Sequence, residues 1–344
     1  MAQTAYGVNA PEAVKLWSRK TMREALKQTW ASRFMGTDSN SLCVIQDDTA
    51  KSAGDRVRVT LRMLLTGDGV SGDGTLEGNE EALVTHTDDL LINQLRHAVR
   101  SSGKMTEQRI PFEIREEARM GLQDWWAERY DVWFMNQLTG NTAQSDTRFT
   151  GNNAVTAHDS DHILSASGND AFSLLLVDQA VLKSHTLTPV IRPVQTEAGP
   201  KYVMFISPES HYDLRRNTDT LEWGAIQTAA MQGGNISDNP IFTGALGEYN
   251  GTILHESFNL PRISSVSQNV LAGAQAMCMG FGRDTPNQNR MSWVEEVFDY
   301  GNQLGVAAGC IAGMKRTIYN DLSFASMVVR STDSTAALAA NGRV

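Results

Sequence analysis

The segment from residue 66 to residue 79 constrains the fold of this chain more than any other. It holds five glycines in fourteen residues, so neither a helix nor a packed strand forms there cheaply. Residues 56–63 precede it and alternate between polar and apolar side chains, which is the pattern of a half-exposed strand. A second extended stretch follows over about residues 82–95. Two strands joined by a long glycine-rich tip predict an arm that projects from the body of the protein.

This arm is acidic throughout. Residues 66–94 contain no lysine or arginine and seven acids: Asp68, Asp73, Glu77, Glu80, Glu81, Asp88 and Asp89. An arm of this kind buries little surface within its own chain, so it needs another surface to lie on. The sequence therefore predicts an oligomer before any family is considered.

The overall charge argues against a protein that binds nucleic acid with its whole surface. The chain has 344 residues, a formal net charge of −9 and a sequence pI near 5.3, whereas neutralising phosphates requires a surplus of Lys and Arg on some face. A shell around packed DNA is a different case, because its wall need not hold the DNA. Three widely spaced cysteines without a C-x-x-C pattern, together with the absence of a visible signal peptide or spanning stretch, predict a protein of the cytosol.

Two long helices are expected. Residues 9–30 begin with a cap residue and an early proline, and one face of this helix is basic, with Lys15, Arg19, Lys20 and Arg23. Such a face is either solvated or contacts an acidic partner or nucleic acid. The strongest helix spans about residues 111–138, opens at Pro111 and ends before Gly140. Because the second half of the chain reads mainly as short strands, the expected fold class is α+β.

No cluster of residues predicts catalysis. Residues 67–72 match G-x-G-x-x-G, but acids and further glycines follow where a dinucleotide fold requires a helix. The cluster of His158, Asp159, Asp161 and His162 has metal-binding side chains. It lies in a polar loop, so a solvated turn is the preferred interpretation and a metal site stays open. We therefore expect no enzyme, no cofactor and no metal.

Several blocks of the sequence resemble the major capsid proteins of the N-four-type family of tailed bacteriophages. The resemblance covers about residues 3–330 and is carried by residues 5–9, 15–18, 67–69, 76–81, 95–100, 146–149, 242–251 and 298–302. It implies the Hong Kong 97-type capsid fold, in which subunits form hexamers and pentamers that tile an icosahedral shell around double-stranded DNA. It also implies assembly in the cytoplasm of a bacterial host and a final location in the virion.

The resemblance further implies a division of the chain. An N-terminal arm would comprise residues 1–54 and an E-loop residues 55–96. The P-domain would comprise residues 97–186 and 291–330, with a spine helix at about 111–138. The A-domain would comprise residues 187–290. Residues 331–344 form the C-terminal tail, and its richness in Ser, Thr and Ala predicts a frayed or extended segment.

Charge suggests how such subunits would meet. The acids of the arm (Asp68, Asp73, Glu77, Glu80 and Glu81) are expected to dock on a basic surface of an adjacent copy. Candidates are Lys15, Arg19, Lys20 and Arg23, or Arg96, Arg100, Lys104 and Arg109. Some capsids of this fold join their subunits through an E-loop lysine, but this arm has none, so we expect non-covalent contacts. Decoration, scaffolding and portal proteins are possible further partners, with weak, non-specific contact to DNA and none to a membrane.

Two alternatives remain open at this point. A soluble homo-oligomeric enzyme with an acidic lid requires a catalytic cluster, which the sequence does not offer. Another virion component, such as a portal or decoration protein, is the second alternative. A portal is expected to have long consecutive helices, and a decoration protein is usually smaller.

Overall fold

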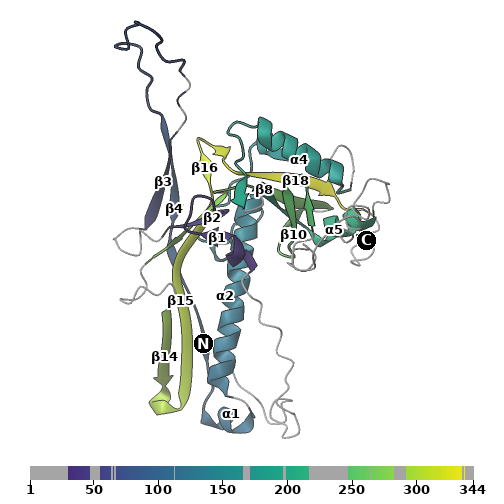
Figure 1. The fold of residues 1–344 in the computed structure, drawn as a ribbon. Helices are drawn as coiled ribbons and strands as arrows, with labels where there is room; N and C mark the ends of the chain where they lie inside the picture. Colours follow the sequence, from purple (N-terminus) through teal and green to yellow (C-terminus); the bar gives the residue numbers. More distant parts are fainter. Residues whose placement is uncertain are drawn as a thin grey trace.

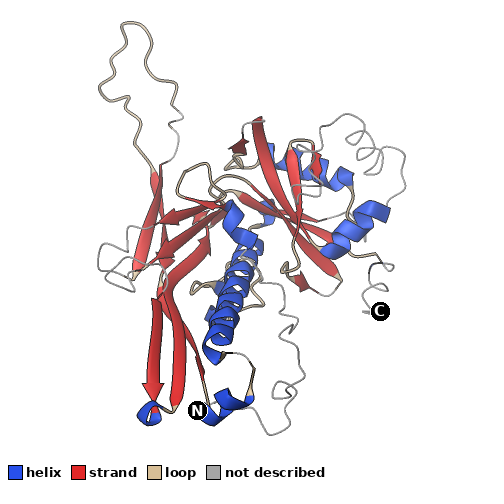
Figure 2. Cartoon of the chain, turned by 60° about the horizontal axis from the view of Figure 1, so that its bottom comes forward, coloured by secondary structure: helices blue, strands red, loops and turns tan. Residues whose placement is uncertain are grey.

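The computed structural model describes residues 30–46, 55–62, 65, 67–111, 113–165, 171–196, 199–216, 247–263, 265–282, 292–334 and 337. The described chain forms an elongated body with a thin arm that projects from one end (Figures 1 and 2). Residues 9–29 of the predicted N-terminal helix lie outside these residues. Three parts position the functional surfaces: a long helix, a sheet packed along it, and a second sheet with two helices.

The long helix α2 (Ile114–Thr139) confirms the strongest prediction from the sequence, although it starts three residues after Pro111. Gly140 ends it in the left-handed conformation, at φ 65°, and closes the last turn through its own N–H. One face of α2 buries Leu122, Trp126 and Trp133, which together anchor the larger hydrophobic core.

The first sheet packs along α2. Its order is β1 (Met35–Gly36), β2 (Cys43–Gln46), β13 (Met277–Phe281), β15 (Gln303–Arg316) and β14 (Ser292–Phe298), and β5 (Asn93–Arg100) also pairs with β15. Strand β15 is the centre of this sheet because it pairs with β13, β14 and β5 along its length. Its alternate side chains Val306, Ala308 and Cys310 are buried in the core shared with α2.

The second sheet carries helices α4 (Leu174–Thr186) and α5 (Pro208–Arg216). Its order is β6 (Ile163–Ser165), β18 (Ser326–Thr332), β12 (Val266–Ala272), β8 (Gly199–Ile206), β10 (Thr252–Glu256) and β9 (Gly247–Tyr249), with β11 (Arg262–Ile263) beside β12 and β7 (Val194–Thr196) beside β8. Ser207 caps α5, because its hydroxyl accepts a hydrogen bond from the Ser210 N–H at 3.1 Å.

The remaining described elements are short. They are the arm strands β3 (Arg56–Arg62) and β4 (Thr85–Leu91), the hairpin β16 (Ile318–Tyr319) and β17 (Leu322–Ser323), helices α1 (Lys104–Arg109) and α3 (Thr147–Thr150), and the 3-10 turns η2 (Trp30–Phe34), η4 (Ser160–His162) and η6 (Asp299–Gly301).

The strands of the second half do not all follow the apolar runs of the sequence. The apolar stretch over residues 271–281 is not one strand, because a turn at Gly273 divides it between the two sheets. A Cβ at Gly273 would lie 2.1 Å from the Arg192 carbonyl oxygen, so the close approach of that backbone requires glycine here. The tail was expected to be frayed or extended, and its start is extended: residues 331–332 belong to β18, and Asp213 accepts a hydrogen bond from the Ser334 N–H at 3.0 Å.

Candidate assembly surface

The projecting arm is the predicted hairpin of β3 and β4. The two strands pair antiparallel, and Arg58 lies directly opposite Asp89, to which its Nε donates a hydrogen bond of 2.8 Å. Val57 and Leu90 face the opposite way and pack against Cys278 of the body. The arm is therefore fixed to the body on one face only, and its tip extends beyond these contacts (Figure 1).

The tip of the arm exposes both acids and apolar side chains. Asp68, Asp73, Glu77 and Glu80 are exposed, as the sequence predicts. The charge pattern does not predict the exposed apolar residues beside these acids, among them Leu65, Leu76 and Leu83, which are each 60% or 61% exposed. An arm with this many uncovered leucines has a surface suited to a partner.

Local hydrogen bonds fix the backbone conformation of the tip. The Glu81 carboxylate accepts from the Gly67 N–H at 2.7 Å, and the Glu80 carboxylate accepts from the Gly78 N–H at 2.8 Å. The Asn79 side chain donates to the Thr75 carbonyl oxygen at 2.9 Å. Two of the five acids expected to dock therefore also shape the backbone of the tip.

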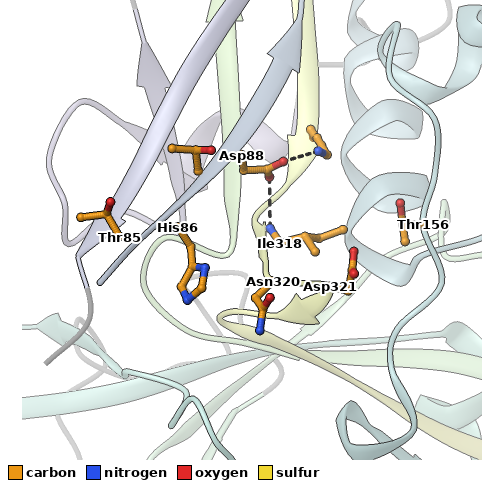
Figure 3. A pocket seen from close by; sticks show the side chains of 9 residues that line it. Thr85, His86, Asp88, Thr156, Ile318, Asn320 and Asp321 are labelled. Carbon is orange, nitrogen blue, oxygen red and sulfur yellow. Dashed lines mark hydrogen bonds and ion pairs between the residues drawn. The ribbon is translucent and has the colours of Figure 1, made fainter. Parts of the chain in front are cut away.

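The root of the arm is held by Asp88. Its carboxylate accepts a hydrogen bond from the Lys315 ammonium and another, at 3.2 Å, from the Ile318 N–H (Figure 3). The carboxylate and the ammonium are both largely buried, so solvent screens this ion pair little. A polar cavity lies beside it, between strand β4 and the β16–β17 turn, and Figure 3 shows His86 and Asn320 facing each other across it.

The end of β4 is fixed just as closely. The Asn153 side chain accepts from the Leu91 N–H at 2.9 Å and donates to the Leu91 carbonyl oxygen at 3.0 Å. At the same place the backbone of Leu91 crosses β15 at Gly313. A Cβ at Gly313 would lie only 1.9 Å from the Leu91 carbonyl oxygen. The position of the arm is thus determined by residues far from it in the sequence.

The predicted basic candidates do not form one surface. Arg96 is exposed on β5, whereas the Arg100 guanidinium lies 4.2 Å from the centre of the Phe298 ring and is hydrogen-bonded to Gln303. Lys104 and Arg109 are exposed on α1, at the other end of the body (Figure 1). Lys15, Arg19, Lys20 and Arg23 lie outside the described residues.

The cluster of His158, Asp159, Asp161 and His162 is not the solvated turn that the sequence indicated. His158 and His162 are buried, and only Asp161 is exposed. His158 hydrogen-bonds the Leu138 carbonyl oxygen at 3.0 Å and the Ser323 hydroxyl at 3.2 Å, while Asp159 hydrogen-bonds His162 at 2.7 Å. No group of three or more possible metal ligands occurs within the described part of the chain.

Burial controls the charges in this cluster. Burial lowers the pKa of His158 well below its usual value, and nearby Arg316 lowers it further, so the imidazole is neutral. Burial alone would raise the pKa of Asp159, but hydrogen bonds from His162 and Ser323 outweigh it and lower the pKa to about 2. Arg316 donates to the Thr156 and Ala157 carbonyl oxygens at 2.9 and 3.1 Å. The cluster therefore joins the loop after α2 to the end of β15.

Comparison with known families identifies the chain. Residues 5–327 match the family described as phage capsid protein. The chain belongs to the phage capsid protein family. The major capsid protein of Pseudomonas phage KPP25 is 27% identical over 359 aligned positions, which cover 90% of this chain and 92% of that protein.

Solved structures agree with this family assignment. The capsid protein of Ralstonia phage GP4 superposes with a TM-score of 0.80 at 28% identity, covering 97% of this chain and 99% of that one. The capsid protein of cyanophage Pam1 superposes with a TM-score of 0.74 at 20% identity, covering 97% and 100%. These likenesses confirm the expected α+β fold of the Hong Kong 97 type. Within the described residues of this capsid-family chain, no helix is long and apolar enough to span a membrane.

Proposed function

We propose that this chain is the major capsid protein of a tailed bacteriophage. Hexamers and pentamers of it form the icosahedral head around the double-stranded DNA genome, and assembly takes place in the cytoplasm of the bacterial host. The observation that carries this proposal is the likeness to the Ralstonia phage GP4 capsid protein over nearly the full length of both chains. The exposed arm supports it, because its leucines remain uncovered within a single copy.

The expected division into domains is proposed as follows for the described elements and the residues around them. The arm of β3 and β4 corresponds to the E-loop, within residues 55–96, and residues 1–54 to the N-terminal arm. Helix α2 and the sheet along it correspond to the P-domain, within residues 97–186 and 291–330. The strands β8, β10 and β12 correspond to the A-domain, residues 187–290, and residues 331–344 to the tail. Strands β6 and β18 pair into the sheet of the A-domain, so the two domains share one continuous sheet.

The arm would hold a neighbouring copy by apolar contact as well as by charge. An exposed ion pair contributes at most about 1 kcal/mol, whereas fully burying a leucine contributes roughly 1.5–3 kcal/mol. Of the two candidate arginines on β5, Arg96 is the better placed to receive the acids, because it is exposed and Arg100 is engaged within its own copy. The arm has no lysine between residues 66 and 94, which supports a non-covalent joint.

Other components would meet this shell. Portal, scaffolding and decoration proteins are proposed as further partners, and packaged DNA is proposed to touch the wall only weakly, since the chain carries a net charge of −9. No catalytic role is proposed, because the chain belongs to a family of capsid proteins.

Electron microscopy tests the proposal directly. The purified chain is expected to form shells, tubes or rings in negative stain, and a uniformly monomeric protein would contradict the proposed function. Replacing Glu77, Glu80 and Glu81 by lysine is expected to block or misdirect capsomer formation. As a matched control, the exposed acids Asp38, Glu128 and Asp161, which lie outside the arm, are replaced by lysine. If the arm variant formed normal particles in normal yield, the docking of the acids would be wrong.

A further inference from the structure

Helix α2 carries a line of acids on the face turned away from its hydrophobic core. Leu122 and Trp126 mark the core side of the helix, and strand β15 runs along α2 (Figures 1 and 2). On the opposite side, side chains recur in steps of three or four positions and therefore form one line along the helix. We call this line the acidic stripe, and its residues are Glu113, Glu117, Met120, Asp124, Glu128 and Asp131. The stripe contains no lysine or arginine.

Two features point to a second helix packed on the acidic stripe. The Asp124 Oδ1 atom is shielded from solvent, yet it has no hydrogen-bond partner among the described residues. A shielded carboxylate oxygen without a partner is costly, so a donor is expected beside it. Gly121 lies next to the stripe and is exposed, and a Cβ there would meet no atom of the described chain within 4 Å. Glycine destabilises a helix relative to alanine, and the close approach of another backbone gives a reason for it here.

The chain itself brings a segment to one end of the acidic stripe. The N–H groups of Trp30 and Ala31 donate to the Asp131 carboxylate at 3.1 and 2.9 Å. Trp30 is the last residue of the helix that the sequence predicts over residues 9–30, so a contact of this helix with α2 would begin at Asp131. At 1.5 Å per residue, a helix over residues 9–29 would be about 32 Å long, and the stripe from residue 113 to residue 131 is about 27 Å long. The two lengths match.

The contact at Asp131 also determines which residues would face each other. Trp30 and Asp131 are 101 positions apart in the sequence. Two helices that run in the same direction keep such an offset along their length, because both rise by the same distance per residue. The offset places three basic residues of the N-terminal helix beside acids of α2, and the pairs are Arg23 with Asp124, Lys27 with Glu128, and Lys15 with Glu116 and Glu117.

We infer that residues 9–29 dock as a helix on the acidic stripe of their own copy, parallel to α2. Arg23 supplies the donor that the Asp124 Oδ1 atom lacks. The stripe fits this occupant because opposite charges face each other along its length, and because the covalent connection at Trp30 keeps the segment at a high effective concentration.

This docking goes beyond the proposed function and has a consequence for it. The basic face of the N-terminal helix would be neutralised within one copy, so it would not receive the acidic arm of a neighbour. The residues concerned are Lys15, Arg19, Lys20 and Arg23. Arg96 on β5 then remains as the exposed candidate for that arm.

Cross-linking with a carbodiimide tests the docking and its register. This reagent joins a lysine amine to a carboxylate only where the two groups are in contact. Isotope-labelled and unlabelled chains are mixed before assembly, cross-linked, digested and analysed by mass spectrometry. A link between Lys27 and Glu128 is expected within peptides of a single isotope. The ion pair of Lys201 with Glu248 is the internal positive control.

Reversing one ion pair and then restoring it tests the contact without the reagent. Arg23→Glu is expected to speed chymotrypsin cleavage after Trp17 about five- to tenfold, because repulsion replaces attraction and the undocked segment becomes more populated. Asp124→Arg in the same chain is expected to restore the wild-type rate. Arg215→Glu, at an exposed position on α5, is the matched control and is expected to leave the rate unchanged.

The outcomes bear on the docking and leave the proposed function to its own test. Links found only between peptides of different isotopes would overturn docking within one copy, because they would place residues 9–29 on a neighbour. No link to the acidic stripe while the control link forms, or wild-type cleavage in Arg23→Glu, would overturn the docking itself. The capsid assignment would stand in each case, since it depends on the formation of shells, tubes or rings. Thermal unfolding of each variant verifies that the body remains folded.

Discussion

Removing two leucines from the tip of the arm should impair assembly more than removing two of its acids. Leu76 and Leu83 are 61% and 60% exposed in the single copy. Covering the exposed part of each would contribute roughly 1–2 kcal/mol, so the pair contributes about 2–4 kcal/mol for each docked arm. Because 1.4 kcal/mol corresponds to a factor of ten, Leu76→Ser with Leu83→Ser should weaken the contact roughly 30- to 800-fold.

The acids should contribute less than the leucines to the docking of the arm. Exposed ion pairs contribute at most about 1 kcal/mol each, and 1 M salt shortens the screening length to about 3 Å. Glu77→Gln with Glu80→Gln should therefore raise the assembly threshold only modestly, and high salt should act in the same direction. Light scattering against protein concentration measures the threshold for each variant.

A matched control separates docking from general loss of surface apolarity. Val190→Ser removes a side chain that is 51% exposed far from the arm, and its threshold should equal that of the wild type. The reasoning fails if the double leucine variant assembles at the wild-type threshold while the glutamine variant does not. That result would mean that charge contributes more to docking than apolar contact does.

Three further changes test features inside one copy. Gly313→Ala places a Cβ 1.9 Å from the Leu91 carbonyl oxygen, so it should destabilise the root of the arm by about 1–3 kcal/mol, measured by urea unfolding. His158 is held neutral, with its pKa well below 6.5, so the unfolded state takes up a proton first and stability should fall as the pH drops below 6.5. Thermal unfolding should show a shallower fall between pH 6.5 and 5 for His158→Gln, and an unchanged slope would contradict the assignment. Asp131 accepts hydrogen bonds from the N–H groups of Trp30 and Ala31 at 3.1 and 2.9 Å, so Asp131→Ala should cost about 1–3 kcal/mol in the same unfolding assay.

Local sequence patterns were sufficient to predict the elements with strong periodicity. The arm strand at residues 56–62 follows from period-two spacing, and helix α2 follows from near-helical spacing. Each of them carries its own signal in adjacent residues. Family resemblance added the fold, which composition and periodicity do not specify beyond the α+β class.

The remaining features depend on residues distant in the sequence. The sequence places His158 in a polar loop. Its burial depends on Ser323 and Arg316, which lie about 160 positions later in the chain. The division of the stretch at residues 271–281 depends on the backbone of Arg192. On the arm, the count of acids predicts a charged surface. It does not predict that the leucines beside those acids are exposed.

Strand β15 has a mechanical consequence for a shell built from this chain. It is fourteen residues long, or about 46 Å, and begins next to the Tyr300 turn and ends at the lysine that holds the arm. A tensile load applied between the root of the arm and the η6 turn would therefore run along one covalent strand. Its hydrogen bonds to β5, β13 and β14 would be loaded in shear along the strand axis, so many would have to break together rather than one after another. Internal pressure would thus meet its greatest resistance along this line of the subunit.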